Sequence, residues 1–293
     1  MRGPSYFVRF FYGLTACVCL FVGLAVTNQV FASKATVPVS TSENPARLLS
    51  AFFGLDNALP FLANRLCLGS WGDDGMPVVL SHTVNPDTLQ PDDFQVTTRS
   101  GAVSVPDCVT LRPAQDPGEL RTVLLIGEFG DAQSDPPASV KVVNDLLSDG
   151  SPTINFRDAS VDVIPLGAGP TLVFAQVVPK SLWGTQTRGT SCPAGVEQIV
   201  RVTWAGGVRL PTGDELADAQ RKLYRVSIVK ADGSSELVTP AALADLADRD
   251  NNHLLCLDTL ARVVSVSFPG GHLVDPNKDL NPDTSVELTG VIN

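Results

Sequence analysis

From Gly75 onward, frequent turn-forming residues divide the chain into short apolar runs, and this spacing constrains the fold most. The runs are rich in Val, Ile, Leu and Thr, and Gly, Pro, Asn and Asp separate them. Several alternate apolar and polar residues, for example Val161-Asp162-Val163, as half-buried strands do. Turns at this spacing favour antiparallel sandwiches over α/β units. The sequence therefore predicts a mostly β protein, an antiparallel β-sandwich of one or two domains with a few short helices.

Thirteen segments of the sequence meet these criteria for a strand. The predicted strands are residues 78–82, 94–98, 102–105, 108–111, 122–126, 139–144, 160–164, 171–177, 199–204, 223–229, 253–257, 263–268 and 285–288.

The segment before these strands has a helical pattern. Residues 33–43 are predicted to be a loose leader, and residues 45–64 a helix that Pro60 ends or kinks. This segment carries too many Leu and Phe residues for a solvated helix. We expect it to pack against the β-core, and the alternative is an apolar surface that binds a partner.

Two further short helices are predicted in the second half of the chain. Thr212 to Glu215 has the spacing of a capping box and precedes helix formers at 216–223. Thr239-Pro240 offers an N-cap and an N1 proline before residues 241–246. We expect both helices to be connections that lie across a sandwich.

The first 32 residues predict export from the cytoplasm. Arg2 and Arg9 flank a basic region, an uncharged apolar stretch follows, and Val30-Phe31-Ala32 offers a cleavage site. This order is typical of a secretory signal peptide spanning residues 1–32. Because residues 10–33 carry no charge, an uncleaved N-terminal membrane anchor is the alternative. A lipobox reading of Leu14 to Cys17 is weaker, because the apolar run continues beyond Cys17.

Cleavage after Ala32 would leave four cysteines, namely Cys67, Cys108, Cys192 and Cys256. An even number in an oxidising compartment predicts two disulfides with three available connectivities, and sequence neighbours suggest Cys67–Cys108 and Cys192–Cys256. No pair has the C-x-x-C spacing, which disfavours redox chemistry and a zinc ribbon.

The chain is acidic, with 31 Asp and Glu residues against 21 Lys and Arg residues and a net charge of −10. A surface of this sign repels phosphate backbones, so we expect no nucleic-acid partner. The partner expected is an unknown protein or surface, with no membrane contact after cleavage.

The segment from Val84 to Leu89, followed by Asp92-Asp93-Phe94-Gln95-Val96, resembles the opening of bacterial Ig-like domains of the S-layer type. In that family a V-[DN]-P-x-[ST]-[LV] turn precedes a strand headed by Phe. The resemblance covers residues 76–130 and implies an Ig-like sandwich in which Phe94 anchors the core.

A second likeness is to fibronectin type III modules. Val200 to Trp204 resembles their tryptophan-bearing strand, and Tyr224-Arg225-Val226 their Tyr-x-Val strand. Both likenesses imply a binding or spacer module without catalytic residues, and fold analogy alone assigns no function.

One acidic stretch suggests a metal. Asp275, Asn277, Asp279, Asn281 and Asp283 alternate along the chain, as oxygen ligands of Ca²⁺ do. Leu280 stands where an EF-hand loop needs Gly, so a polar turn is the alternative. A second acidic stretch, around Asp245, Asp248 and Asp250, would join the same site if the fold brought the two together. Calcium is the one cofactor that the sequence suggests.

No catalytic motif occurs. The chain lacks G-x-S-x-G, S-x-x-K, G-x-G-x-x-G and a P-loop, and its three histidines, His82, His253 and His272, have no metal-ligand spacing. We therefore expect no catalytic and no cofactor-binding residues. Trp71 and Trp183 are candidates for a sugar platform, whereas Trp204 is better explained as core.

The predicted organisation is a signal peptide at 1–32, a leader and apolar helix at 33–69, an Ig-like domain at 70–150, and a second β domain or continuation at 151–293. The expected function is a secreted or surface-associated, non-catalytic binding or structural role with calcium as a stabiliser. The alternative is a secreted hydrolase whose Asp and His residues meet only in the fold.

Overall fold

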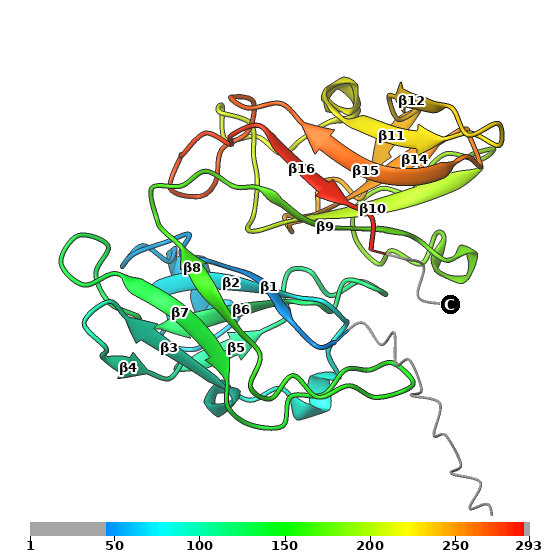
Figure 1. Ribbon diagram of the computed structural model, residues 1–293. Helices are drawn as coiled ribbons and strands as arrows, with labels where there is room; N and C mark the ends of the chain where they lie inside the picture. The colour runs from blue at the N-terminus through cyan, green and yellow to red at the C-terminus, as the bar shows by residue number, and fades with distance from the viewer. Residues whose placement is uncertain (1–44, 290–293) are drawn as a thin grey trace, which may run out of the picture. The chain divides into compact units, whose positions relative to one another are not determined.

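The computed structural model describes residues 45–289, which form sixteen strands and five short 3-10 helices (Figure 1). The predicted signal peptide lies outside the described residues. No α-helix occurs between residues 45 and 289, so the prediction of a mostly β protein with few helices is confirmed. Residues Asn44–Asn293 belong to one compact unit, and the predicted domain boundaries within it stay a prediction.

The first half of the chain forms one eight-stranded sheet. Its order is β4-β3-β7-β8-β1-β2-β6-β5. The strands are β1 (Leu48–Phe52), β2 (Asp74–Leu80), β3 (Phe94–Thr98), β4 (Val103–Ser104), β5 (Cys108–Thr110), β6 (Thr122–Gly127), β7 (Pro137–Val142) and β8 (Ser160–Ile164), with 3-10 helices η1 (Phe61–Arg65), η2 (Pro86–Thr88) and η3 (Pro91–Asp93) between them.

The end strands of this sheet, β4 and β5, are close neighbours in sequence, so the sheet must curl round on itself. Its concave side holds a core that includes Phe53, Phe94 and Phe156. Phe94 is fully buried, as the turn pattern before it predicted. One pair, β1 with β8, is parallel, whereas the prediction was wholly antiparallel.

The second half forms two four-stranded sheets, β13-β14-β10-β9 and β12-β11-β15-β16. The strands are β9 (Leu172–Val177), β10 (Gln198–Trp204), β11 (Arg225–Val229), β12 (Ser235–Val238), β13 (Ala242–Ala244), β14 (Asn252–Leu257), β15 (Arg262–Phe268) and β16 (Thr284–Glu287), with 3-10 helices η4 (Lys180–Leu182) and η5 (Asp218–Leu223).

These two sheets enclose an aromatic core, which makes the second half sandwich-like. The indole Nε1 of Trp204 donates to the Tyr224 hydroxyl at 3.1 Å, and the Phe268 ring stands edge-on to both aromatic rings. All three side chains are buried, so Trp204 is a core residue as predicted. The hydrogen bond satisfies the one polar atom of the indole inside the core.

Polar contacts join the two halves. Arg201 on β10 is buried and donates to the Pro117 carbonyl at 3.1 Å. The Asn251 amide donates to the Thr122 hydroxyl at 3.1 Å, and the Arg121 guanidinium lies 3.9 Å from the centre of the Phe174 ring.

The predicted helix at 45–64 is wrong. Residues Leu48–Phe52 form β1, which pairs with β2 and β8, and only Phe61–Arg65 is helical, as the short η1. The helical pattern gave the wrong prediction because β1 is nearly buried on both faces. A continuous apolar run does not distinguish such a strand from a buried helix. The expected packing of this segment against the β-core is confirmed for Ala51 and Phe52.

The predicted helix at 241–246 is also wrong, because residues Ala242–Ala244 form β13 and pair with β14. The helix predicted at 216–223 is reduced to η5, which begins at Asp218. The expected Thr212 cap instead bonds within its own turn, to the Asp214 carboxylate. Pairing with β14 overrode the local helix signals at residues 242–244.

The four cysteines pair as Cys67–Cys108 and Cys192–Cys256, the pairing that sequence neighbours suggested. Two disulfides indicate an oxidising, extracytoplasmic compartment. Within residues 45–289, no helix is long and apolar enough to cross a membrane.

Candidate functional site

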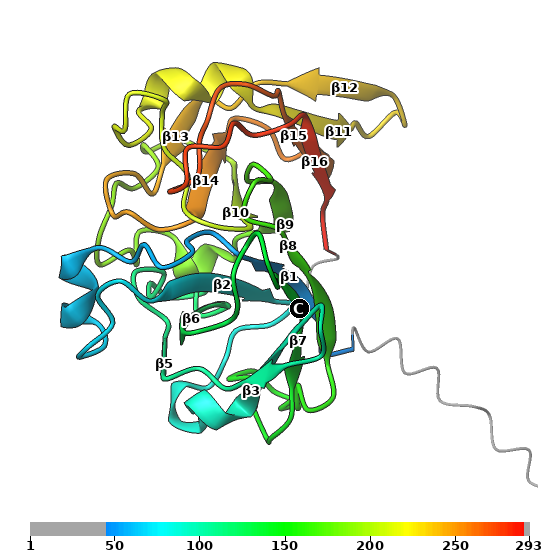
Figure 2. The ribbon, with the colours of Figure 1, turned by 90° about the vertical axis from the view of Figure 1, so that its left-hand side faces the viewer.

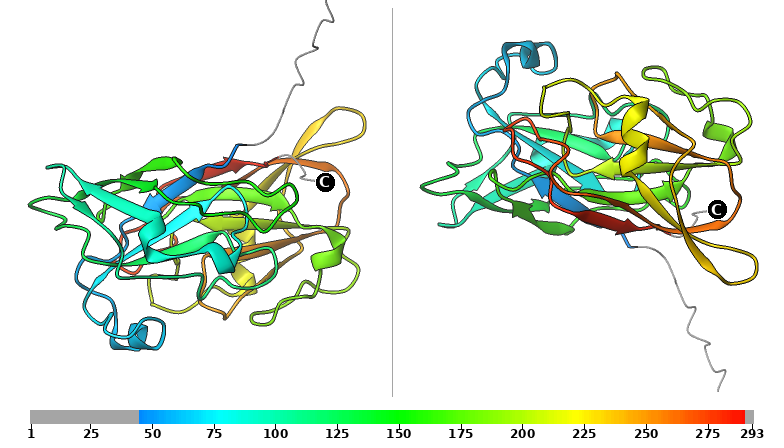
Figure 3. Two further views of the ribbon diagram at one scale, coloured as in Figure 1. Left: turned by 90° about the horizontal axis from the view of Figure 1, so that it is seen from below. Right: turned by 90° about the horizontal axis from the view of Figure 1, so that it is seen from above.

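The segment between β1 and β2 exposes apolar side chains that a soluble protein normally buries. We call residues 59–73 the stapled loop. Leu68 is 99% exposed, Phe61 68% and Trp71 65%, and Leu62 and Leu66 are exposed as well. Figures 2 and 3 show this loop, in blue, standing off from the sheets. Contiguous apolar surface of this kind is typical of interaction sites.

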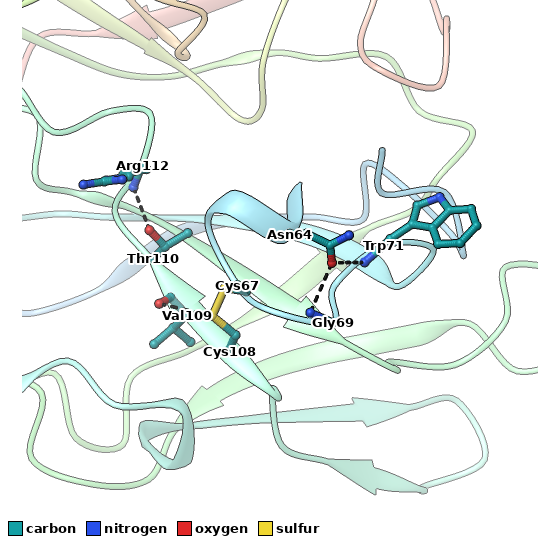
Figure 4. Close-up of a disulfide and its surroundings, with 8 residues drawn as sticks. All are labelled: Asn64, Cys67, Gly69, Trp71, Cys108, Val109, Thr110 and Arg112. Atoms are coloured by element: carbon teal, nitrogen blue, oxygen red, sulfur yellow. Dashed lines mark hydrogen bonds between the residues drawn. A yellow bond between two sulfur atoms is a disulfide. The ribbon is translucent and has the colours of Figure 1, made fainter. Parts of the chain in front are cut away.

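The Cys67–Cys108 disulfide fixes the loop to β5, an edge strand of the curled sheet (Figure 4). Inside the loop, the Asn64 side-chain oxygen accepts from the backbone N–H groups of Gly69 at 3.1 Å and Trp71 at 3.3 Å. Gly69 has a φ of 94°, a conformation that favours glycine. The loop is therefore held in one shape although its tip is solvated.

Asp74 anchors the root of the loop. Its carboxylate accepts from the backbone N–H of Asn57 at 2.7 Å and from that of Phe129 at 2.8 Å. Burial raises the pKa of Asp74 to about 6, against the opposing effect of these two hydrogen bonds. The sequence analysis assigned Asp74 no role, because two adjacent acids between glycines give no sign of distant backbone partners.

A small apolar cluster supports the loop from beneath. Leu59, Ala63 and Cys67 are buried there against Ile126 of β6. The inner face of the loop thus contributes to the core, while its outer face presents Leu, Phe and Trp. The loop has only one basic and one acidic residue, Arg65 and Asp73, so its surface is almost uncharged.

An apolar cavity of about 170 Å³ begins beside the loop, and Leu59 belongs to both. Phe52, Pro77 and Leu124 line it from the first half of the chain, and Gly206 and Gly207 from the second. None of the three histidines lines it.

Four buried carboxylates gather where the two halves meet: those of Glu119, Asp245, Asp248 and Asp250. Burial, and then repulsion from Glu119, raises the pKa of Asp245 to about 11, and burial also raises the pKa values of Asp248 and Asp250. Arg201 is the nearby cation, 3.3 Å from a Glu119 oxygen. The raised pKa values favour the neutral forms of Asp245, Asp248 and Asp250.

The five residues predicted to bind calcium mostly bond to the backbone of their own loop or to one another. Asn281 accepts from the N–H groups of His272 and Leu273, and Asp283 accepts from that of Gly270. Asp275 accepts from the N–H of Asp279, and the Asn277 amide donates to the Asp279 carboxylate.

Asp275 is buried, and one of its oxygens has no hydrogen-bond partner between residues 45 and 289. Over the same residues, no group of three or more His, Cys, Asp or Glu side chains is arranged to hold a metal ion. The calcium site stays a prediction.

The three histidines do not form one cluster, although His253 and His272 contact the neighbouring rings of Tyr224 and Phe268. His253 is buried and its Nδ1 is 2.7 Å from the Tyr224 hydroxyl, while His82 contacts the Ser81 hydroxyl at 2.9 Å. Burial lowers the pKa of His253 to about 4, so the ring is neutral at pH 7.

No protein-family model matches the chain, and no curated protein matches its sequence.

Proposed function

We propose that this protein is a secreted or surface-associated, non-catalytic binding protein that docks onto an apolar groove of a partner protein through the stapled loop. The observation that carries the proposal is the exposure of Leu68, Phe61 and Trp71 on a loop that a disulfide and internal hydrogen bonds keep rigid. Tryptophan is enriched among the few residues that dominate binding energy at protein interfaces, and rigidity reduces the entropy lost on binding.

Charge and shape favour a protein over the other partners. The net charge of −10 disfavours nucleic acid and anionic lipid. The loop protrudes next to a recess, since Leu59 takes part in both. A protein surface can complement a protrusion and a recess together, whereas a bilayer presents a uniform face. The calcium stabilisation expected from the sequence is not needed for this role.

The hydrolase alternative has less support. The carboxylates that gather, such as Asp245 and Glu119, are buried, and the histidines do not join them. Substrate access and a general base within reach of a substrate proton are both needed for such chemistry.

Site-specific photo-crosslinking tests the docking role. A photoreactive amino acid at position 68 is expected to give one saturable adduct with a surface fraction from the source organism. Unlabelled wild-type protein should compete for this adduct, and a Leu68→Asp/Trp71→Ser variant should not. The matched control carries the photoreactive group at position 260, because Leu260 is 71% exposed but lies outside the loop.

Equal adducts from positions 68 and 260, or competition by the loop variant, would reject the proposal. Two further measurements test for partners other than a protein groove. Flotation with neutral and anionic vesicles would reveal a membrane partner, and sedimentation would reveal a second copy of this chain; loop-dependent binding in either would replace the proposed protein groove.

A further inference from the structure

The apolar cavity has the walls of a small-molecule site. Four leucines, three prolines and Phe52 line it. The leucines are Leu55, Leu59, Leu111 and Leu124. A cavity of roughly 150 Å³ lined by such side chains accommodates a benzene ring. The volume of about 170 Å³ therefore suits one ring or a short branched chain.

Glycine shapes part of this wall. A Cβ at Gly206 would lie 2.8 Å from Phe52 Cδ1, and one at Gly75 would lie 3.3 Å from Leu59. A side chain at Gly206 would collide with the apolar lining, and one at Gly75 would crowd it. At Gly207, by contrast, a Cβ would meet nothing within 4 Å.

Two arginines also line the cavity, and both are exposed. Arg112 uses its Nε to donate to Gln115 at 3.1 Å and makes no ion pair with a residue in 45–289. Arg249 has neither an ion pair nor a side-chain hydrogen bond over the same residues. In a protein of net charge −10, two unpaired guanidinium groups beside one apolar recess favour an anion.

Asp250 is the one acid in the lining, and it is buried. Burial and repulsion from Glu119 and Asp248 raise its pKa well above the ordinary value. This shift favours the neutral carboxylic acid, which does not repel an anion. Asn251 is already engaged, because its amide donates to the Trp204 carbonyl and the Thr122 hydroxyl.

We propose that this cavity binds a single apolar group that bears a carboxylate, with the apolar group against the leucines and the carboxylate paired with Arg112 and Arg249. The chemistry fits a free aromatic acid and equally the C-terminal apolar residue of a peptide. This inference does not depend on the docking role of the stapled loop.

Titration of protein carrying ¹³C-labelled leucine methyls tests the site, with phenylacetate as the probe. Phenylacetate is expected to shift the methyls of the four lining leucines and to bind at least tenfold more tightly than its neutral analogue phenylacetamide. Shifts confined to other leucines, or equal affinity for acid and amide, would overturn the proposal.

Separate variants test the role of the arginine charges and the role of the cavity volume. Arg112→Ala/Arg249→Ala should weaken phenylacetate binding at least tenfold and leave phenylacetamide unchanged, while Gly207→Leu should weaken both. The matched control is Arg99→Ala/Arg262→Ala, which removes the same charge from two exposed positions outside the cavity lining. Equal weakening by the control would reject the role of Arg112 and Arg249.

Short peptides that end in Phe, with a free or an amidated C-terminus, identify the source of the ligand. Shifts of the same methyls by the free-acid peptide alone would support the proposal and assign the site to a peptide terminus. Shifts by phenylacetate without shifts by either peptide would support it and assign the site to a free acid.

Discussion

Two disulfide-fixed loops of this protein differ in whether their apolar side chains are exposed or packed against the core. The stapled loop, residues 59–73, is held by Cys67–Cys108 and exposes Phe61, Leu68 and Trp71. The loop of residues 180–197, which we call the covered loop, is held by Cys192–Cys256 and turns its apolar groups inward.

The two tryptophans show the contrast directly. Trp183 of the covered loop packs over a buried cluster with Val178 and Ile199, and its Nε1 donates to the Val178 carbonyl at 3.0 Å. Trp71 has its ring contact with the exposed Phe61, at 6.0 Å between centroids, and its Nε1 has no hydrogen bond to a residue in 45–289. One disulfide thus holds a loop against the core, and the other fixes a loop whose apolar residues stay exposed.

Removal of each disulfide should give the largest effects. Cys192→Ser/Cys256→Ser and Cys67→Ser/Cys108→Ser should each cost about 4 kcal/mol of unfolding free energy, with the slightly larger loss for the first pair. The covered loop closes over the longer separation, 64 residues against 41, and Cys256 is fully buried. Urea unfolding under oxidising conditions measures both. A greater loss for the Cys67 pair would contradict the assignment of the covered loop to stability.

Truncation of the two tryptophans should give the next largest difference. Trp183→Ala should cost about 2 kcal/mol, since it removes a half-buried ring from the cluster. Trp71→Ala should change stability by less than about 0.5 kcal/mol, as expected of an exposed side chain. Equal losses in urea unfolding would show that Trp71 is structural.

Alkaline pH should loosen the covered loop before the stapled loop. The Asp245 N–H donates to the Thr190 carbonyl, and Arg188 donates to the backbone carbonyl of Asp248. The carboxyls of Asp245 and Asp248 themselves lie against Gly189 of the covered loop. The folded state raises the pKa of Asp245 from 3.8 to about 11. Its stabilising contribution is complete below pH 4 and is lost as the pH rises toward 11. Asp74, with a pKa of about 6, is already ionised above neutral pH.

Hydrogen exchange and thermal unfolding between pH 7 and 10 measure this effect. Amides of residues 180–197 should lose protection beyond the intrinsic change, and Tm should fall by roughly 2–4 °C for each kcal/mol lost. Asp245→Asn, which stays neutral, should reduce the pH dependence. A pH-independent Tm over this range would disprove the role of the carboxyls.

Calcium would be a third means of holding a loop, beside disulfides and carboxyl contacts. The prediction requires that excess chelator lower Tm by about 2–4 °C, on the order of a 1 kcal/mol loss. Asp279→Ala should then remove the sensitivity. An unchanged melting curve in chelator would eliminate calcium and leave residues 275–283 as a hydrogen-bonded turn.

The smallest effect is expected at the tip of the stapled loop. Leu68→Asp should leave Tm unchanged within 1 to 2 °C, on the order of 0.5 kcal/mol, because the side chain is 99% exposed. Leu260→Asp is the control at another exposed leucine. A large loss at position 68 alone would show that the loop tip is part of the fold.

Local patterns in the sequence located most strands because alternation and turn residues are local properties. Residues 94–98 and 160–164 match β3 and β8 in full. β1 and β13 were read as helices, because their pairing with distant strands overrides local preference. The Asn-Pro turn before β3 was identified correctly, since the Asn85 side chain accepts from the Asp87 N–H as such turns do.

The candidate sites were less predictable. An apolar surface for a partner at residues 45–64 was the alternative prediction, but the exposed residues extend to Trp71 and belong to a disulfide-fixed loop. Arg112 and Arg249 are more than a hundred residues apart along the chain and become neighbours of one cavity only in the fold.

The sequence by itself determined the β-rich class, the even set of cysteines and the acidic charge, since composition and short-range pattern carry these properties. Only the tertiary structure decided which apolar residues are buried and which are exposed, and which charged groups meet. Burial depends on contacts between distant segments, and Leu59 and Leu68 show the result within one loop.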